Sequence, residues 1–370
     1  MAHQLRRCAA DGADGVASAI VASGVRLHPD NARISGLLLR NLNSENASIA
    51  IVGAGGSIGS VITKALLGSG RHHITALARA SSKIALPDGV RRVVIDYNNE
   101  LTLVEALKGQ DFLIITLGVS AAKDGGNAEV KLVKAAAAAG VPYVMPNAYG
   151  ADPLNEKMRR ELHSAEQFLA VKALIEKLGV SRWIVLGCGF WYEWSLVGDG
   201  QNRFGIDFQR RTVTFFDDGE ERIATSTWDQ SGRAVASFLS LKRLPDDEND
   251  TSPTIENWVN RALYIASFRV NQKEMFESAK HVTGTTDADW MIEYVASETR
   301  FKAAVEAMER GEKGAFLRQM YTRVFFPTGE GDHSRHGPLA NSALGLPVEN
   351  IDEATKEGLR LYDLGALGFD

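Results

Sequence analysis

The stretch IAIVGAGGSIGSVITKALL, from Ile49 to Leu67, decides the fold. A short apolar run reaches Val52 and gives way to a glycine-rich turn, and apolar residues then recur at helical spacing from Ile58. This order of strand, tight turn and helix is the context that a dinucleotide-binding fingerprint needs. The sequence therefore predicts a nucleotide site at this turn.

Each glycine in the turn has a separate predicted task. Gly53 permits the turn, Gly55 or Gly56 lets the backbone approach a pyrophosphate, and Gly59 lets the helix pack closely on the strand. The free N–H groups at the start of the helix, around Ser57 and Ile58, favour the charge of a phosphate. The predicted loop contacts are Gly53, Gly55, Gly56, Ser57, Ile58 and Gly59.

Composition excludes several classes of protein. The chain has 370 residues, a formal net charge of −5 and two cysteines, Cys8 and Cys188, far apart in sequence. Nothing indicates a polyanion-binding surface, a disulfide framework or metal-ligand spacing. No apolar run approaches the roughly 18 residues of a membrane span. We therefore expect a soluble cytoplasmic protein without a metal, a nucleic-acid partner or a membrane partner, and the oligomeric state is left open.

Residues 1–47 precede the fingerprint and do not resemble a folded domain. They contain several arginines and an apolar patch at 16–25, but Asp11, Asp14 and Asp30 argue against a transit peptide. The segment is interpreted as an N-terminal extension, either mobile or a mis-assigned start of the chain, without an assigned function.

From Ser48 onward, strand and helix patterns alternate. Strands are expected after the first at 73–79, 90–95, 111–117, 142–145 and 183–186, with helices at 101–107, 127–139 and 163–178. Six strands separated by helices predict a Rossmann-type, doubly wound α/β fold with a parallel sheet. We expect an NAD(P)-binding domain at 48–190 and a smaller, α-rich substrate lobe at 191–370 whose late elements pack on the sheet.

A dense aromatic segment, GFWYEW, follows Cys188. Phe190, Trp191, Tyr192 and Trp194 either belong to the core or form an apolar substrate pocket at the carboxyl end of the sixth strand. Beyond it the sequence predicts a strand at 211–216 and helices at 228–241, 273–282, 287–310 and 352–360.

Four motifs carry a family resemblance. The chain resembles the NmrA-like and isoflavone reductase-like atypical short-chain dehydrogenases, and its tail is similar to fungal CipA-like oxidoreductases. The motifs are VGAGGSIG (52–59), AAAAAGVPYVMPNAYG (135–150), GCGF (187–190) and SALGLPVENIDEATK (342–356). The resemblance covers about residues 48–358 and implies an NADP-dependent oxidoreductase acting on a small aromatic molecule.

The end of the second strand indicates which cofactor is bound. NAD sites usually have a carboxylate there, but this chain has Arg79 followed by two serines and Lys83. Cations and hydroxyls bind a 2′-phosphate that a carboxylate would repel, so NADP(H) is expected. The family resemblance also implies an adenine contact at Asp96 and nicotinamide-side contacts at Thr116 and Gly118, and Asn147 is included among the cofactor-binding residues.

The proton donor is harder to assign. Reductases of this family use a lysine on the helix after the fifth strand, and the matching position here is Phe168, which cannot transfer a proton. Lys172 lies one turn later on the same side of the helix and is the first candidate. Tyr149 is the second, although Pro153 replaces the lysine that a short-chain dehydrogenase would have four residues later. His163 is a third alternative.

Two functional classes remain. In the first, the protein is an NADPH-dependent reductase of an aromatic secondary metabolite. In the second, it is a non-catalytic NADP-binding regulator of the NmrA type, which Phe168 favours. A nonredox isomerase or cyclase on the same scaffold is a further alternative.

Overall fold

The structure is a computed structural model that describes residues 46–118, 127–162 and 166–367. Nearly all of the predicted N-terminal extension lies outside these ranges, and so does His163. None of the helices in the described part of the chain is long and apolar enough to cross a membrane.

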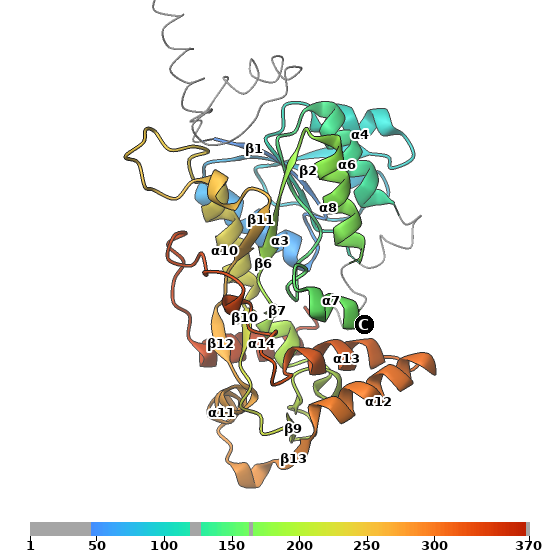
Figure 1. Cartoon of the computed structure of the whole chain (residues 1–370), viewed down its shortest axis with the longest axis vertical. Coiled ribbons are helices and arrows are strands. Elements are labelled where there is room, and N and C mark those ends of the chain that lie inside the picture. Colours follow the sequence, from blue (N-terminus) through green and yellow to red (C-terminus); the bar gives the residue numbers. More distant parts are fainter. Residues whose placement is uncertain (1–45, 119–126, 163–165, 368–370) are drawn as a thin grey trace, which may run out of the picture. The chain divides into compact units, whose positions relative to one another are not determined.

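A parallel sheet of seven strands lies in the upper half of Figure 1, in the order β11-β6-β5-β4-β1-β2-β3. Its strands are β1 (Ser48–Val52), β2 (His73–Arg79), β3 (Val90–Ile95), β4 (Phe112–Ile115), β5 (Tyr143–Met145), β6 (Arg182–Gly187) and β11 (Arg261–Tyr264). The strand order reverses between β1 and β4, and open α/β sheets bind ligands outside the carboxyl ends of the strands at such a point. The predicted Rossmann-type fold is confirmed, and β11 adds a seventh strand that the sequence pattern missed.

Helices cover both faces of the sheet. One face holds α3 (Ser57–Ser69) and α10 (Trp228–Leu239); the other holds α4 (Glu100–Leu107), α6 (Ala128–Ala139) and α8 (Glu166–Leu178). Ile49 and Ile51 of β1 pack in the first hydrophobic cluster, and Ala50 and Val52 pack in the second. This alternation follows from the two-residue period of a strand. We call these two sides the α3/α10 face and the α8 face.

The rest of the described residues form further helices and two small sheets, ordered β12-β10-β7 and β13-β9-β8. The sheet strands are β7 (Phe190–Trp191), β8 (Ile206–Asp207), β9 (Thr212–Phe216), β10 (Ile223–Ser226), β12 (Phe268–Val270) and β13 (Met291–Val295). The helices are α7 (Glu156–Leu162), α9 (Tyr192–Leu196), α11 (Gln272–Thr283), α12 (Ser297–Glu309), α13 (Ala315–Val324) and α14 (Ile351–Asp363). The division at residue 190 stays a prediction; α10 and β11 come from the second half of the chain and extend the layers of the first.

The predicted helix at 287–310 is wrong. Met291–Val295 forms β13, which pairs in parallel with β9, and helix α12 begins only at Ser297. Ile292, Tyr294 and Val295 favour strands, and pairing with β9 satisfies their backbone groups.

Candidate active site

The glycine-rich turn follows β1 at the point where the strand order reverses. Gly53 has φ of 82°, and a Cβ added there would lie 2.1 Å from the carbonyl oxygen of Thr116. A Cβ on Gly59 would lie 2.1 Å from the Gly53 carbonyl oxygen and 2.6 Å from Thr116 Oγ1. Distances this short leave no room for a side chain, so both positions require glycine.

Helix α3 starts directly at this turn, and the first backbone N–H groups of a helix have no partner within it. Gly56 is the N-cap; among the described residues no side chain caps the helix, and its first turn holds no acidic residue. Thr116 donates from N and Oγ1 to the Val52 carbonyl, at 2.9 and 2.7 Å, which fixes the end of β4 beside the turn. The N–H groups at Ser57 and Ile58 and the helix dipole therefore suit a phosphate.

The loop after β2 folds over the glycine turn. A Cβ on Gly55 would lie 2.2 Å from Ile84 Cγ2, so the loop that carries Lys83 lies against the turn. Arg92 of β3 donates to the Ser82 carbonyl at 2.6 Å and holds the loop in this position. The structure thus brings the two halves of the predicted cofactor site together, and Arg92 is a residue that sequence reasoning missed.

Arg79 is the last residue of β2 and lies near the phenol of Tyr97. Burial raises the pKa of Tyr97, and the nearby Arg79 guanidinium offsets part of that rise. Asp96 is exposed after β3, where its carboxylate accepts from the Asn98 N–H at 2.9 Å. Lys83 is also exposed, and the two cations, Arg79 and Lys83, suit a phosphorylated ribose.

A buried carboxylate fixes the loops after β4 and β5. Glu129, in the first turn of α6, accepts from the Asn147 N–H at 2.8 Å and from Gln167 Nε2 at 2.9 Å. Asn147 Nδ2 donates to the Leu117 carbonyl at 2.9 Å. Burial raises the pKa of Glu129, and the two hydrogen bonds lower it in part. Asn147 is therefore held rigidly at the carboxyl edge, and exposed Gly118 follows Leu117 there.

Tyr149 lies on the α3/α10 face after β5. Its ring packs in the same cluster as α3 and α10, and no described atom forms a hydrogen bond with its buried hydroxyl. Burial raises its pKa well above the ordinary value, and Cys188 and Glu129 raise it further. Cys188 is a buried thiol just past β6. The carboxyl ends of β5 and β6 therefore present an unpartnered hydroxyl beside a thiol.

The four aromatic residues after Cys188 separate into different environments. Trp191 lies 6.4 Å from Trp194 and 6.0 Å from Trp228, between ring centroids. Trp194 donates its indole N–H to the Leu367 carbonyl at 3.1 Å. Tyr192 is fully buried and its hydroxyl is 2.9 Å from Thr355 Oγ1. Tyr192 thus has a core environment, whereas Trp191 contacts the Cys188 thiol just past β6.

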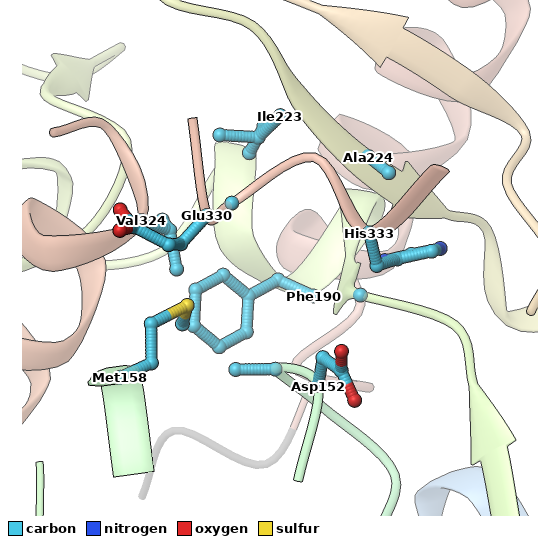
Figure 2. A pocket seen from close by; sticks show the side chains of 11 residues that line it. Asp152, Met158, Phe190, Ile223, Ala224, Val324, Glu330 and His333 are labelled. Carbon is cyan, nitrogen blue, oxygen red and sulfur yellow. The ribbon is translucent and has the colours of Figure 1, made fainter. Parts of the chain in front are cut away.

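Phe190 points into a separate small cavity (Figure 2). Its ring stacks on Tyr321 at 4.3 Å, and Met158, Asp152 and His333 also line the cavity. The cavity volume is about 10 Å³, which is about the space of one water molecule. A cavity of this size is too small to hold an aromatic substrate.

Lys172 lies near the amino ends of the sheet strands, and on the α8 face rather than the α3/α10 face. Its Nζ is 2.8 Å from Glu176 Oε1 and 5.2 Å from the ring centroid of Trp183. Trp183 is the second residue of β6 and packs on the α8 face, as does Phe168. About five residues of strand, or ~16 Å, separate Trp183 from Cys188 at the carboxyl edge. This placement does not support Lys172 as the proton donor.

Glu193 is a buried carboxylate that sequence reasoning missed. It is 4% exposed, and its two oxygens accept from the Trp228 N–H at 3.2 and 3.1 Å, at the start of α10. Burial raises the pKa of Glu193 to about 8. In the sequence, the only sign of this residue is an acidic side chain within an aromatic run. Its partner Trp228 lies 35 residues further along the chain, so the contact could not be predicted.

Replacing Glu193 by Gln is expected to stabilise the fold increasingly as pH rises. The pKa is raised in the folded state, so the stability that the bound proton provides is lost between the ordinary pKa of 4.5 and about 8. Gln keeps an acceptor for the Trp228 N–H and does not titrate. The stability advantage of the variant should therefore grow by up to about 1.4 kcal/mol per pH unit in this window and level off above it. Urea unfolding at several pH values checks this, and parallel curves for both proteins would contradict it.

Comparisons with known proteins agree with this geometry. A family profile described as NAD(P)H-binding matches residues 53–185. The curated protein "Oxidoreductase aprR" of Aspergillus flavus is 29% identical over 310 residues, covering 82% of this chain and 96% of that protein. A crystal structure of isoflavone reductase superposes with a TM-score of 0.65 at 22% identity, covering 84% of this chain and 99% of that one. A structure solved with NADP⁺ and (+)-pinoresinol gives a TM-score of 0.63 at 18% identity, over 85% and 99% of the two chains.

The resemblance expected from the sequence motifs is thus confirmed for the cofactor-binding domain and for the fold. The chain contains an NAD(P)H-binding domain built around the Gly53–Gly59 turn, and it has the fold of isoflavone reductase.

Proposed function

We propose that the protein is an NADPH-dependent reductase of a neutral aromatic secondary metabolite, with Tyr149 as the proton donor. The observation that carries this proposal is the buried, unpartnered hydroxyl of Tyr149. Buried polar groups normally have hydrogen-bond partners, and exceptions need an explanation such as a missing ligand. The hydroxyl lies after β5, on the same face as α3 and at the same edge as the glycine turn.

Bound NADPH would supply a hydride. The glycine turn and the start of α3 would hold its pyrophosphate, and Arg79 and Lys83 its 2′-phosphate. Glu129 and Asn147 fix the loops beside which the nicotinamide would lie. Tyr149 stays protonated because it is buried, and it would donate its proton to the oxygen or carbon that becomes negative in the reaction.

Relatives support this proposal. The Aspergillus flavus protein is named an oxidoreductase, and the pinoresinol-bound structure holds both NADP⁺ and an aromatic ligand. The proposal is tested by comparing metabolite profiles with and without the protein while following NADPH absorbance. Loss of NADPH together with one new reduced aromatic product is the expected result, and unchanged NADPH would contradict it.

The second candidate is a regulator that binds NADP without turnover. Phe168 favours it, because this residue occupies the position of the family lysine and packs edge-on against Trp183 at 6.1 Å. A regulator would bind NADPH and consume none with any aromatic substrate.

Arg79 should set the preference for NADPH over NADH. We expect at least about a tenfold preference, the effect of one charge-assisted hydrogen bond. Arg79→Glu should remove it, because a carboxylate repels the 2′-phosphate. Arg91→Glu is the matched control, since Arg91 is an exposed arginine on β3. Titration of each variant with both nucleotides checks this; equal affinities in the unchanged protein would refute the assignment.

A further inference from the structure

Two tryptophans at the carboxyl edge have buried indole N–H groups without an oxygen or nitrogen acceptor among the described residues. No described atom accepts a hydrogen bond from Nε1 of Trp191 or Trp228. The Trp191 side chain contacts the Cys188 thiol and lowers the pKa of that thiol, although burial raises the same pKa by more. A thiol sulfur is only a weak hydrogen-bond acceptor. Other tryptophans differ: the indole N–H groups of Trp183, Trp194 and Trp290 donate to Glu176, Leu367 and Thr285.

The two unpartnered groups belong to one aromatic pair. The rings of Trp191 and Trp228 are 6.0 Å apart at an angle of 60°, although 37 residues separate them in sequence. Trp228 is only 8% exposed. An unsatisfied buried donor costs roughly 1–3 kcal/mol, so two in one pair indicate a site that a ligand completes.

Helix packing places the pair beside the nucleotide turn. A Cβ on Gly232 of α10 would lie 2.6 Å from the Val61 carbonyl of α3, so the two helices cross closely. Beyond their carboxyl ends, His72 Nε2 is 3.1 Å from Ser240 Oγ. The helices therefore run side by side in the same direction, and Trp228, the first residue of α10, lies at the end where α3 begins.

The surroundings of the pair select a neutral ligand. An indole N–H is a donor only, so it requires an acceptor atom such as a carbonyl or ether oxygen. Glu193 lies directly behind the Trp228 backbone, and its burial strongly disfavours its own charged form. The same desolvation would disfavour an anionic ligand group, while the indole faces favour an aromatic ring.

We propose that the indole N–H groups of Trp191 and Trp228 bind acceptor oxygens of the aromatic substrate, so that these two residues select where the substrate carries its oxygen atoms. The inference rests on the proposed function in one respect: it takes the ligand of the two tryptophans to be the substrate of the reductase. The two tryptophans then determine specificity, separately from proton donation by Tyr149.

The test compares two probes of similar shape on the NADP⁺-loaded protein. Flavone carries a carbonyl and a ring ether oxygen, and 2-phenylnaphthalene has neither. Trp191→Phe and Trp228→Phe remove one donor each and keep an aromatic ring. Trp290→Phe is the matched control, because its indole N–H donates to Thr285 Oγ1 at 2.9 Å, away from β6. Calorimetric titration gives the ratio of flavone affinity to 2-phenylnaphthalene affinity, in which effects of ring size largely cancel.

We expect the unchanged protein to prefer flavone and each of the two variants to lose about tenfold of that preference, the effect of one neutral hydrogen bond. Trp290→Phe should keep the full preference. The inference is wrong if the unchanged protein shows no preference for flavone, or if neither variant alters it. Because no hydride transfer is needed, intact flavone preference without turnover would reject the reductase and leave the oxygen-binding site standing.

Discussion

Tyr149→Phe is expected to reduce turnover by about 10²–10⁴-fold, the usual loss when a general acid is removed. Phe keeps the ring that packs with the α3/α10 face and removes only the unpartnered hydroxyl. NADPH affinity should therefore stay unchanged, and the loss should appear in kcat rather than in cofactor binding. Steady-state kinetics together with NADPH titration measure both quantities.

Lys172→Met is the matched control for this experiment. Lys172 pairs with Glu176 beside Trp183, at the amino end of β6, so its loss should leave turnover within about twofold. Full activity in Tyr149→Phe with a large loss in Lys172→Met would reverse our assignment of the proton donor.

Gly59→Val is expected to abolish measurable NADPH binding, by at least about 100-fold, or about 2.7 kcal/mol. The new Cβ would meet the Gly53 carbonyl at 2.1 Å, a backbone atom that cannot move without opening the turn. The same clash should lower the free energy of unfolding by roughly 1–3 kcal/mol. Titration with NADPH and urea unfolding check the two effects separately.

Gly68→Val on the same helix is the control. A Cβ there would meet nothing within 4 Å, so both NADPH affinity and stability should be retained. Retained affinity in Gly59→Val would remove the glycine turn from the proposed cofactor site.

The sequence predicted those parts of the site that depend on local pattern. The turn from Gly53 to Gly59 carries its own information, because strand, glycine spacing and helix adjoin in the chain. After the first strand, five further strands of the sheet were recognisable as apolar runs. Strand β11 was missed because it begins with Arg261 and pairs with β6, which is distant in sequence.

The remaining parts depend on long-range packing. A helical wheel correctly put Lys172 near Phe168, but it could not show that both lie on the α8 face. Glu193 and Trp228 meet because β10 pairs in parallel with β7, which sets Ser226 opposite Trp191, and no local pattern encodes that pairing. The wrong prediction of a helix at 287–310 has the same cause, because β13 forms by pairing with β9, which is distant in sequence.

Transfer of deuterium from NADPH labelled at the nicotinamide C4 position tests the central claim most directly. The protein is incubated with labelled NADPH and a panel of neutral aromatic ketones and benzylic ethers, and products are analysed by mass spectrometry. We predict one deuterium in a new C–H bond of a product for each NADPH consumed, with far slower transfer in Tyr149→Phe. Tight binding of NADPH without transfer of label to any compound would contradict the reductase and favour an NADP-binding regulator.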